Sequence, residues 1–247
     1  MKHQCLAAMP YKRRRNYRRR RSKRKPYFRR RSGRTLTRYP RYRRVGIKNI
    51  DNFLPSKLCV KLKYADDIQT VAAVIGSIVM RGNSAFDPDW SFGGHQPMGY
   101  DQITPFYNRY YVTSSAIEVI PYAVTGASSL APIVTLYAGT STSSLSQISD
   151  LLEQPGVRTL QLSDMNNTAR EGVHAFAIRA KASTYKMLGV KPSSDEDAQA
   201  LVTSNPNKMW FWHINHANAT ATNFAMRIRV RMWLTIVFIN KKTLTGS

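Results

Sequence analysis

The chain has 247 residues and a formal charge of +24 at pH 7, most of which lies at one end. Residues 1–44 contain 16 Arg, 4 Lys and no Asp or Glu, which leaves 18 basic and 14 acidic side chains for the other 203 residues. The two cysteines, Cys5 and Cys59, are too few for a disulfide framework, and no apolar run is long enough to span a bilayer. We therefore expect a soluble intracellular protein with no membrane partner, in which Cys59 is a buried thiol.

The basic segment at the start of the chain is expected to be a disordered arm. Its like charges repel one another, and it buries too little apolar surface to offset the roughly 1–2 kcal/mol per residue that ordering a backbone costs. The remaining residues are long enough for one sizeable domain and contain no second linker or charge run. The predicted organisation is an arm over residues 1–44 and a single domain over residues 45–247.

Arginine and aromatic residues give the arm a specific chemistry. Arginine outnumbers lysine by four to one, and its planar guanidinium pairs bidentately with phosphate and stacks on bases. Aromatic rings offer surfaces on which unpaired bases stack, at roughly 1–3 kcal/mol per base. We therefore interpret the arm as a segment that binds single-stranded nucleic acid. The residues assigned to this role are Lys12, Arg13, Arg14, Arg15, Arg18, Arg19, Arg20, Arg21, Lys23, Arg24, Lys25, Arg29, Arg30, Arg31, Arg34, Arg38, Arg41, Arg43 and Arg44, with Tyr17, Tyr27 and Tyr42.

Two other interpretations of the arm are weaker. A membrane-surface anchor needs an apolar partner signal, which the sequence does not show. A nuclear import signal needs only about 5–8 basic residues, so import is expected as an additional role and not as the sole one. If about ten of the charges contact phosphates at once, affinity falls by roughly three to five decades between 50 and 200 mM salt. Such binding is indifferent to base sequence and suits packaging of nucleic acid.

After the arm, period-two alternation and β-branched residues predict a series of strands. Residues 57–64 alternate between apolar and basic or thiol side chains, as a half-buried strand does. Residues 70–82 are apolar on both faces, which favours a central strand, and Pro121 indicates a bulge or an edge position. The predicted strands are Lys57–Tyr64, Thr70–Gly82, Tyr110–Val124, Ala131–Gly139, His174–Leu188, Lys208–His216 and Phe224–Ile239.

The last of these strands has the clearest pattern. Up to Met232, apolar residues alternate with small or basic ones, so one face is expected in the core and the other to carry a ladder of arginines. After Trp233 the run LTIVFI is continuously apolar, which predicts that the strand passes from an exposed face into a buried centre. The ladder, which we assign as a secondary basic face, comprises Arg227, Arg229 and Arg231.

Helical signals are short and few. The stretch SSLSQISDLLEQPG, residues 143–156, begins with a capping Ser and ends at Pro-Gly, and PFYNRY predicts a further helical turn. Seven or eight strands with a few short helices favour a sandwich or barrel. We predict an all-β fold, a single eight-stranded antiparallel jelly roll (β-sandwich) with short loop helices. The apolar face of the first helix comprises Leu145, Ile148, Leu151 and Leu152.

No residue pattern typical of catalysis is found. The sequence lacks a phosphate-binding loop, a nucleophile elbow and a metalloprotease motif, so we expect no enzymatic activity, no cofactor and no metal site. His213 and His216 are three apart, which on a strand places them on opposite faces and makes a poor metal site. Acidic residues also occur in two groups, at positions 87, 89 and 101 and at residues 195–197.

Asp87, Asp89 and Asp101 would suit a hard cation such as calcium. The favoured interpretation is a turn around Pro88 in which the carboxylates cap backbone amides. The second group, residues 195–197 (DED), is expected on a solvated loop, with contact to a basic patch on a neighbouring subunit as the alternative.

Two neighbouring motifs, RGNSAFDPDW and GGHQPMGYDQITPFYNRYYV, occupy most of residues 81–112. They resemble the capsid proteins of circovirus-like viruses, the circular Rep-encoding single-stranded (CRESS) DNA viruses, in which an N-S-x-[FYW]-D-P-D stretch precedes an H-Q-P-x-G-[FY]-D-Q stretch. The arm, the chain length and the number of strands agree with this family less specifically. The motif residues for which we expect a role at a subunit contact are Asn83, Asp87, Asp89, His95, Gln96, Gly99, Tyr100, Asp101 and Gln102.

The resemblance implies a coat protein that assembles into a small icosahedral shell (T=1, about 60 subunits) and packages circular single-stranded DNA with an inward-facing arm. It also implies nuclear import through the arm, so that the protein occurs in the virion and in the host nucleus during assembly. The expected partners are single-stranded nucleic acid, other copies of the chain, the import machinery and an unidentified host receptor. The start MP followed by YKRRR resembles that of the family, so residues 1–8 are expected to be an N-terminal extension.

Two alternatives remain. The coat protein of a small single-stranded RNA virus or satellite virus has the same construction, and the arm does not distinguish DNA from RNA, so only the motif favours DNA. A non-assembling viral shuttle protein for nucleic acid would also need the arm. That protein would remain a monomer or small oligomer, whereas a coat protein forms large closed particles.

Overall fold

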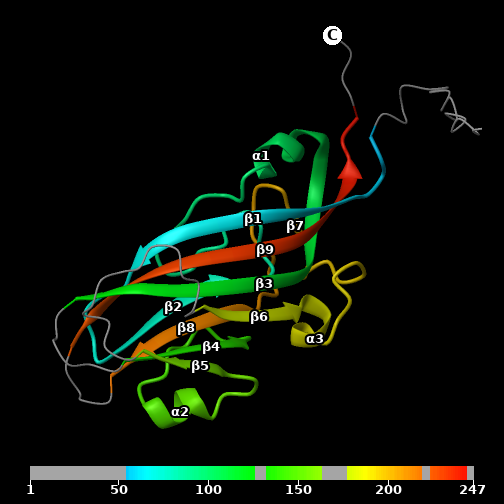
Figure 1. Ribbon diagram of the computed structural model, residues 1–247. Coiled ribbons are helices and arrows are strands. Elements are labelled where there is room, and N and C mark those ends of the chain that lie inside the picture. Colours follow the sequence, from blue (N-terminus) through cyan, green and yellow to red (C-terminus); the bar gives the residue numbers. More distant parts are fainter. Residues whose placement is uncertain (1–53, 126–131, 163–176, 219–222, 244–247) are drawn as a thin grey trace, which may run out of the picture. The chain divides into compact units, whose positions relative to one another are not determined.

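The computed structural model describes residues 54–125, 132–162, 177–218 and 223–243, which form two β-sheets packed face to face (Figure 1). Three short helices and a 3-10 turn lie in the loops. The elements are β1 (Leu58–Gln69), β2 (Ile75–Arg81), α1 (Tyr100–Ile103), the 3-10 turn η2 (Thr104–Phe106), β3 (Tyr107–Thr125), β4 (Ile133–Gly139), α2 (Ile148–Leu152), β5 (Arg158–Gln161), β6 (Ile178–Ser183), α3 (Thr184–Leu188), β7 (Ala200–Leu201), β8 (Phe211–Ala217) and β9 (Ala225–Lys241).

The strand order is that of a jelly roll. The larger sheet runs β1-β9-β3-β6, with β7 paired to β3, and the smaller sheet runs β2-β8-β4-β5. All of these pairs are antiparallel, and the chain passes repeatedly from one sheet to the other. The predicted all-β jelly roll is therefore confirmed. The two-residue strand β7 is additional to the eight that were predicted.

The core lies between the sheets and is rich in aromatic rings. Trp210 and Trp212 pack edge to face with ring centroids 5.2 Å apart, and both are almost completely buried. Each indole N–H has a partner, because Trp210 Nε1 donates to Thr184 Oγ1 (3.2 Å) and Trp212 Nε1 donates to Ser115 Oγ (3.0 Å). Satisfied indoles of this kind let large apolar surfaces be buried without an unpaired donor.

The predicted period-two patterns are confirmed on the long strands. In β1 the apolar row faces inward and the basic row outward, although the strand continues to Gln69. In β3 the register shifts between Pro121 and Ala123, where a bulge or an edge position was expected. Cys59 lies in the outward row of β1 and is exposed, so the prediction of a buried thiol was wrong.

The end of β9 differs from the prediction of a fully buried centre. Alternation continues through the strand: Leu234, Ile236 and Phe238 are buried, whereas the intervening residues from Trp233 to Ile239 are half-buried. The inward row packs on the smaller sheet, and the outward row stays at the surface of the larger sheet. The continuous apolar run therefore marks a partly covered outer face and not burial on both sides.

Strand β2 was predicted to be central but is the edge strand of the smaller sheet. From Ile78 to Arg81 its residues are nevertheless buried, and the following loop folds back along its free edge. The Arg81 amide donates to the Pro88 carbonyl (2.7 Å), and the Trp90 amide donates to the Val79 carbonyl (3.1 Å). The Val79 amide donates in turn to Ser91 Oγ (2.8 Å). The loop thus takes the place of a neighbouring strand.

The predicted strand His174–Leu188 is also shorter than expected. Only β6 is extended, and α3 follows it at once because the Ser183 hydroxyl caps the Lys186 amide (3.2 Å). Gly189 ends the helix with a φ of 73°, a conformation that glycine adopts without strain. Residues 174–176 lie outside the described part of the chain.

Helical turns occur in both stretches where they were predicted, but their first and last residues differ from the prediction. Of PFYNRY only Pro105 and Phe106 are helical, because Tyr107 already begins β3. Helix α2 lies within the predicted stretch but has no side-chain cap at its start. Leu145, Ile148 and Leu151 pack with Tyr137 and Ala217. Leu152 was predicted on the same face but is 43% exposed.

The histidine on β8 at position 216 is a buried titratable group. Its ring packs edge to face on Phe224 (4.8 Å between centroids), and Nε2 lies 3.4 Å from Thr70 Oγ1. A Cβ on Gly76 would lie 2.0 Å from the ring, so only glycine fits opposite it. Burial lowers the pKa of His216 to about 4.

We expect the His216→Gln variant to show a weaker loss of stability in acid than the parent chain. The unfolded chain protonates His216 near pH 6.5, whereas the folded chain does so only near pH 4. This contribution to stability is complete above pH 6.5 and declines as the pH falls towards 4, by roughly 2–3 kcal/mol. Urea unfolding at pH 7 and pH 4.5 measures it, with His95→Gln as the exposed control. Equal pH dependence in parent and His216→Gln chains would contradict this assignment.

Candidate nucleic-acid interface and subunit-contact loop

The arm residues assigned to nucleic-acid binding, Lys12 to Arg44, lie outside the described residues. Their role therefore stays a prediction. The predicted secondary basic face and the 81–112 motif are both within the described part, and each can be placed on a specific surface of the jelly roll.

The secondary basic face lies on the outward side of the larger sheet. Arg227 and Arg229 are exposed on β9, and Arg231 is half-exposed. Strand register places further cations on the same side, because β9 pairs with β1 and β3, and β3 pairs with β6. We call this surface the basic face; its cations are Lys61, Lys63, Arg179, Lys181, Arg227, Arg229 and Arg231.

Two carboxylates interrupt the basic face. Glu118 accepts from Arg179 Nε (2.7 Å) and from Arg231 Nη1 (3.2 Å), and its side chain is 5% exposed. Burial alone would raise the pKa of Glu118, but the two guanidinium groups outweigh it and hold the pKa below its ordinary value. Asp67 lies 3.7 Å from Arg229, an exposed pair that contributes little to stability.

Glu118 and Asp67 therefore neutralise part of the charge of the arginine ladder. The positively charged surface also extends over more strands than the sequence indicated. Seven cations face two carboxylates across β1, β9, β3 and β6, which leaves a net positive face. The lysines of β1 could have been found, because the alternation of that strand placed Lys61 and Lys63 on one side. Only the strand register shows that they share that side with the arginines.

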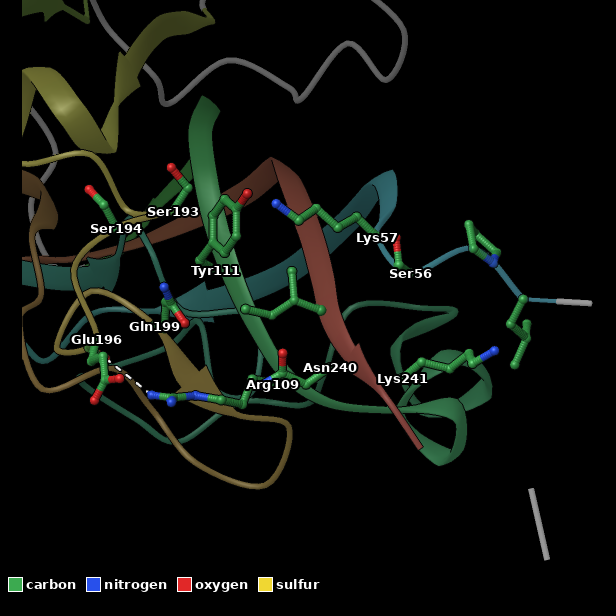
Figure 2. A pocket seen from close by; sticks show the side chains of 13 residues that line it. Ser56, Lys57, Arg109, Tyr111, Ser193, Ser194, Glu196, Gln199, Asn240 and Lys241 are labelled. Carbon is green, nitrogen blue, oxygen red and sulfur yellow. Dashed lines mark hydrogen bonds between the residues drawn. The ribbon is translucent and has the colours of Figure 1, made fainter. Parts of the chain in front are cut away.

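At one end of the larger sheet a polar hollow of about 760 Å³ lies beside the start of β1 and the end of β9. Figure 2 shows Lys57, Arg109 and Lys241 around it, with Arg109 reaching towards Glu196, whose backbone carbonyl accepts from Arg109 Nη2 (3.4 Å). The hydroxyl groups of its lining come from Ser56, Tyr111, Ser193 and Ser194. These cations and hydroxyl groups suit an anionic group such as a phosphate, but the Glu196 side chain also lines the hollow and offsets part of the positive charge.

The acidic group at residues 195–197 lies next to this hollow. Lys208 Nζ contacts the carboxylates of Asp195 (2.9 Å) and Asp197 (3.6 Å) within the same chain. The Asp195 side chain also accepts from the Asp197 amide (3.0 Å). These contacts agree with the interpretation of a solvated loop.

The first part of the 81–112 motif, residues 82–91, forms the loop that covers β2, and Arg81 holds it. Its Nη1 donates to Asp87 Oδ2 (2.6 Å) and to the backbone carbonyls of Asp87 (2.9 Å) and Asp89 (2.8 Å). The guanidinium also lies 4.6 Å from the centre of the Trp90 ring. Because Arg81 is only 8% exposed, these interactions form in a largely dry environment and fix the turn around Pro88.

The three aspartates of the motif have separate partners. Asp89 Oδ1 accepts from the amides of Ser91 (2.8 Å) and Phe92 (3.2 Å), as expected for a capping carboxylate, and burial raises the pKa of Asp89. Asp87 pairs with Arg81 instead of capping an amide. The side-chain amide of Gln96, turned so that its nitrogen faces Asp101, donates to Oδ2 (3.1 Å). Among the described residues no cluster of three or more His, Cys, Asp or Glu is placed to hold a metal ion.

Other motif residues fasten the loop to the rest of the domain. Asn83 Oδ1 accepts from the Trp210 amide (3.1 Å), and Nδ2 donates to the Lys208 carbonyl (2.8 Å). Tyr100 donates to the Val202 carbonyl (2.9 Å), after a turn at Gly99 with a φ of 93°. Asn83 and Tyr100 are fully buried. A neighbouring subunit can therefore contact only those residues of the motif that are exposed.

The exposed residues of the motif include large apolar side chains, which we did not predict from the sequence. Trp90 is 43%, Phe92 50% and Met98 88% exposed. Trp90 and Phe92 border a hollow of about 730 Å³ between β2 and residues 142–146. His95 and Gln102 are also exposed, with the His95 ring stacked on Tyr64 (4.7 Å). Buried hydrogen bonds thus attach the loop to the domain, and the loop presents apolar side chains at the surface.

No protein-family model and no curated protein matches the chain. Similar solved structures include viral particles and capsid proteins. The semi-empty virus-like particle of Macrobrachium rosenbergii nodavirus shares 12% identity, with 77% of this chain and 97% of the other covered and a TM-score of 0.42. Turnip yellow mosaic virus shares 12% identity over 78% and 86% of the chains (TM-score 0.41). The decameric BFDV capsid protein shares 12% identity over 74% and 98% (TM-score 0.39).

Among the described residues, no helix is long and apolar enough to cross a membrane.

Proposed function

We propose that the chain is the coat protein of a small icosahedral virus and packages single-stranded nucleic acid through residues 1–44. The observation that carries the proposal is the combination of 20 arm cations with a jelly roll whose larger sheet has a basic outer face. A jelly roll of this size suits the wall of a shell, and clustered arginine suits phosphate. The exposed apolar loop supports association with other copies, since isolated domains rarely leave such side chains grouped at the surface.

The finer assignment rests on the resemblance of residues 81–112. It favours the coat protein of a CRESS DNA virus, with a T=1 shell around circular single-stranded DNA and with nuclear import through the arm. Phosphate contacts do not distinguish DNA from RNA, so the coat protein of a single-stranded RNA virus is the second candidate.

The nucleic acid selected in cells separates these two candidates. Particles would be purified from cells that contain both a replicating circular single-stranded DNA and abundant RNA, and treated with nuclease before extraction. We expect the protected nucleic acid to be degraded by DNase and to resist RNase. Protected RNA in place of DNA would favour the RNA-virus alternative, and the absence of any protected nucleic acid would overturn the packaging role.

We expect the double substitution of Phe92 and Met98 by serine to reduce particle formation strongly without changing the unfolding midpoint. Burying a side chain of this size at a contact contributes roughly 1.5–3 kcal/mol, and each subunit repeats the loss. Neither side chain is needed for the core, because both are at least half exposed. Sedimentation velocity measures assembly, with Leu201→Ser as a matched exposed control on β7. Normal assembly of the double variant would show that the loop is not a subunit contact.

A further inference from the structure

Trp233 occupies an unusual position in the middle of the basic face. It is a half-buried outward residue of β9, directly opposite Lys63 on β1 and Ala116 on β3. Ala116 is in turn directly opposite Lys181 on β6. Because neighbouring strands are about 4.8 Å apart, the four residues form one straight row in which a lysine lies on each side of the indole. The next row holds Arg231, Glu118 and Arg179.

The small side chain of Ala116 leaves space beside the indole. A hollow of about 350 Å³ opens there, lined by Trp233 and Ala116 and by the cations Arg158, Arg179 and Lys181. None of the described lining residues is acidic. Glu118, in the next row, positions one of these cations, because its Oε1 is contacted by both Nη2 (2.6 Å) and Nε (2.7 Å) of Arg179. An aromatic surface, an adjacent hollow and surrounding cations therefore occur together.

We propose that Trp233 is a stacking site for a base of single-stranded nucleic acid, with the flanking phosphates contacting Lys63, Lys181 and Arg179. This inference rests on the proposed packaging function and assigns a second contact to it, separate from the arm. Charge favours this occupant: an apolar protein surface would bury Lys63 and Lys181 without partners, whereas a nucleic-acid strand supplies phosphates for them and for Arg179, which Glu118 already holds. The outer side of the larger sheet is then the side that faces the packaged strand.

Among the residues that the structure describes, the opposite outer surface of the sandwich does not offer this combination. Over the smaller sheet, Tyr137 and Ala217 are covered by residues 145–157, which carry the exposed acids Asp150 and Glu153. Charge repulsion therefore disfavours nucleic acid there. This difference between the two sheets supports one orientation of the subunit towards the strand.

Tryptophan fluorescence of the full chain tests the proposal. The chain has four tryptophans, none of them in the arm; Trp210 and Trp212 are buried, so Trp90 and Trp233 are the ones that a ligand can reach. We expect unlabelled oligo(dT) to lower the fluorescence of the parent chain and of the Trp90→Phe variant by the same absolute amount, and to leave Trp233→Phe nearly unquenched. Trp90→Phe leaves Trp233 untouched, so the test does not depend on tolerance of substitution at residue 233.

The affinity of the variants for oligo(dT) is the second measurement. In a filter-binding assay we expect Trp233→Leu to bind oligo(dT) at least about 5-fold more weakly than Trp233→Phe, which keeps an aromatic ring. Binding by the full chain without quenching of Trp90→Phe would overturn the stacking site and leave the proposed function intact. Absence of any binding at low salt would overturn the proposed function itself.

Discussion

Replacing Arg81 with leucine is expected to lower the free energy of unfolding by about 3 kcal/mol and to prevent particle formation. The guanidinium supplies the donors for Asp87 and for the carbonyl of Asp89, and it packs on Trp90. Leucine would leave these acceptors in a buried loop without donors. The Asp87 side chain is 28% exposed, so water can replace part of the loss and the effect lies at the lower end for a broken buried pair. Urea unfolding and sedimentation velocity measure the two effects.

Arg81→Lys and Arg158→Leu are the controls. Lysine keeps the positive charge but lacks the planar guanidinium that packs on Trp90, so its loss should be about half as large. Arg158 is exposed on β5, and its substitution should change stability by less than about 0.5 kcal/mol. If Arg81→Leu unfolds at the same urea concentration as Arg158→Leu, the loop does not depend on Arg81.

The second large effect concerns the arm. Changing Arg18, Arg19, Arg20 and Arg21 to glutamine is expected to make the salt dependence of oligonucleotide binding less steep, by about 3 in the slope of log K against log salt. Each lost phosphate contact removes about 0.7 from the slope for a single strand. At 50 mM salt the affinity should fall as well, because fewer counterions are released. Filter binding from 50 to 200 mM salt measures both quantities.

Substituting Tyr17, Tyr27 and Tyr42 by leucine is the matched control for the arm. Loss of stacking should weaken binding by a similar factor at every salt concentration and leave the slope unchanged, because tyrosine carries no charge that displaces a counterion. A slope that does not change in the arginine variant would mean that these arginines do not contact phosphates.

Patterns confined to one strand predicted much of the fold. Alternation in β1 and β9 correctly identified inward and outward rows, and Pro121 marked the irregular point of β3. Pairing between distant segments was not predictable in the same way. The loop that completes the edge of β2 depends on contacts made by Arg81 and Trp90, and a buried apolar strand looks central whether a strand or a loop covers it.

The basic face likewise contains residues that the pattern of one strand reveals and residues that only the pairing of strands reveals. The arginines of β9 are visible as a periodic ladder, but Lys63 and Lys181 join them only through the register of β1 with β9 and of β3 with β6. In the sequence, Glu118 is a single acid within a largely apolar strand, and only the packing shows that it holds two arginines. Residues that act through tertiary contacts leave little trace in a single sequence.

Electron microscopy and nucleic-acid extraction on the full chain, beside a chain lacking residues 1–44, test the central claim most directly. Both samples would be imaged by negative stain, treated with nuclease, and then extracted. The packaging account predicts uniform closed shells from both chains, with protected nucleic acid only in the full-length sample. A full chain that stays a monomer or dimer while still binding oligonucleotides would contradict the coat-protein assignment and favour the shuttle protein.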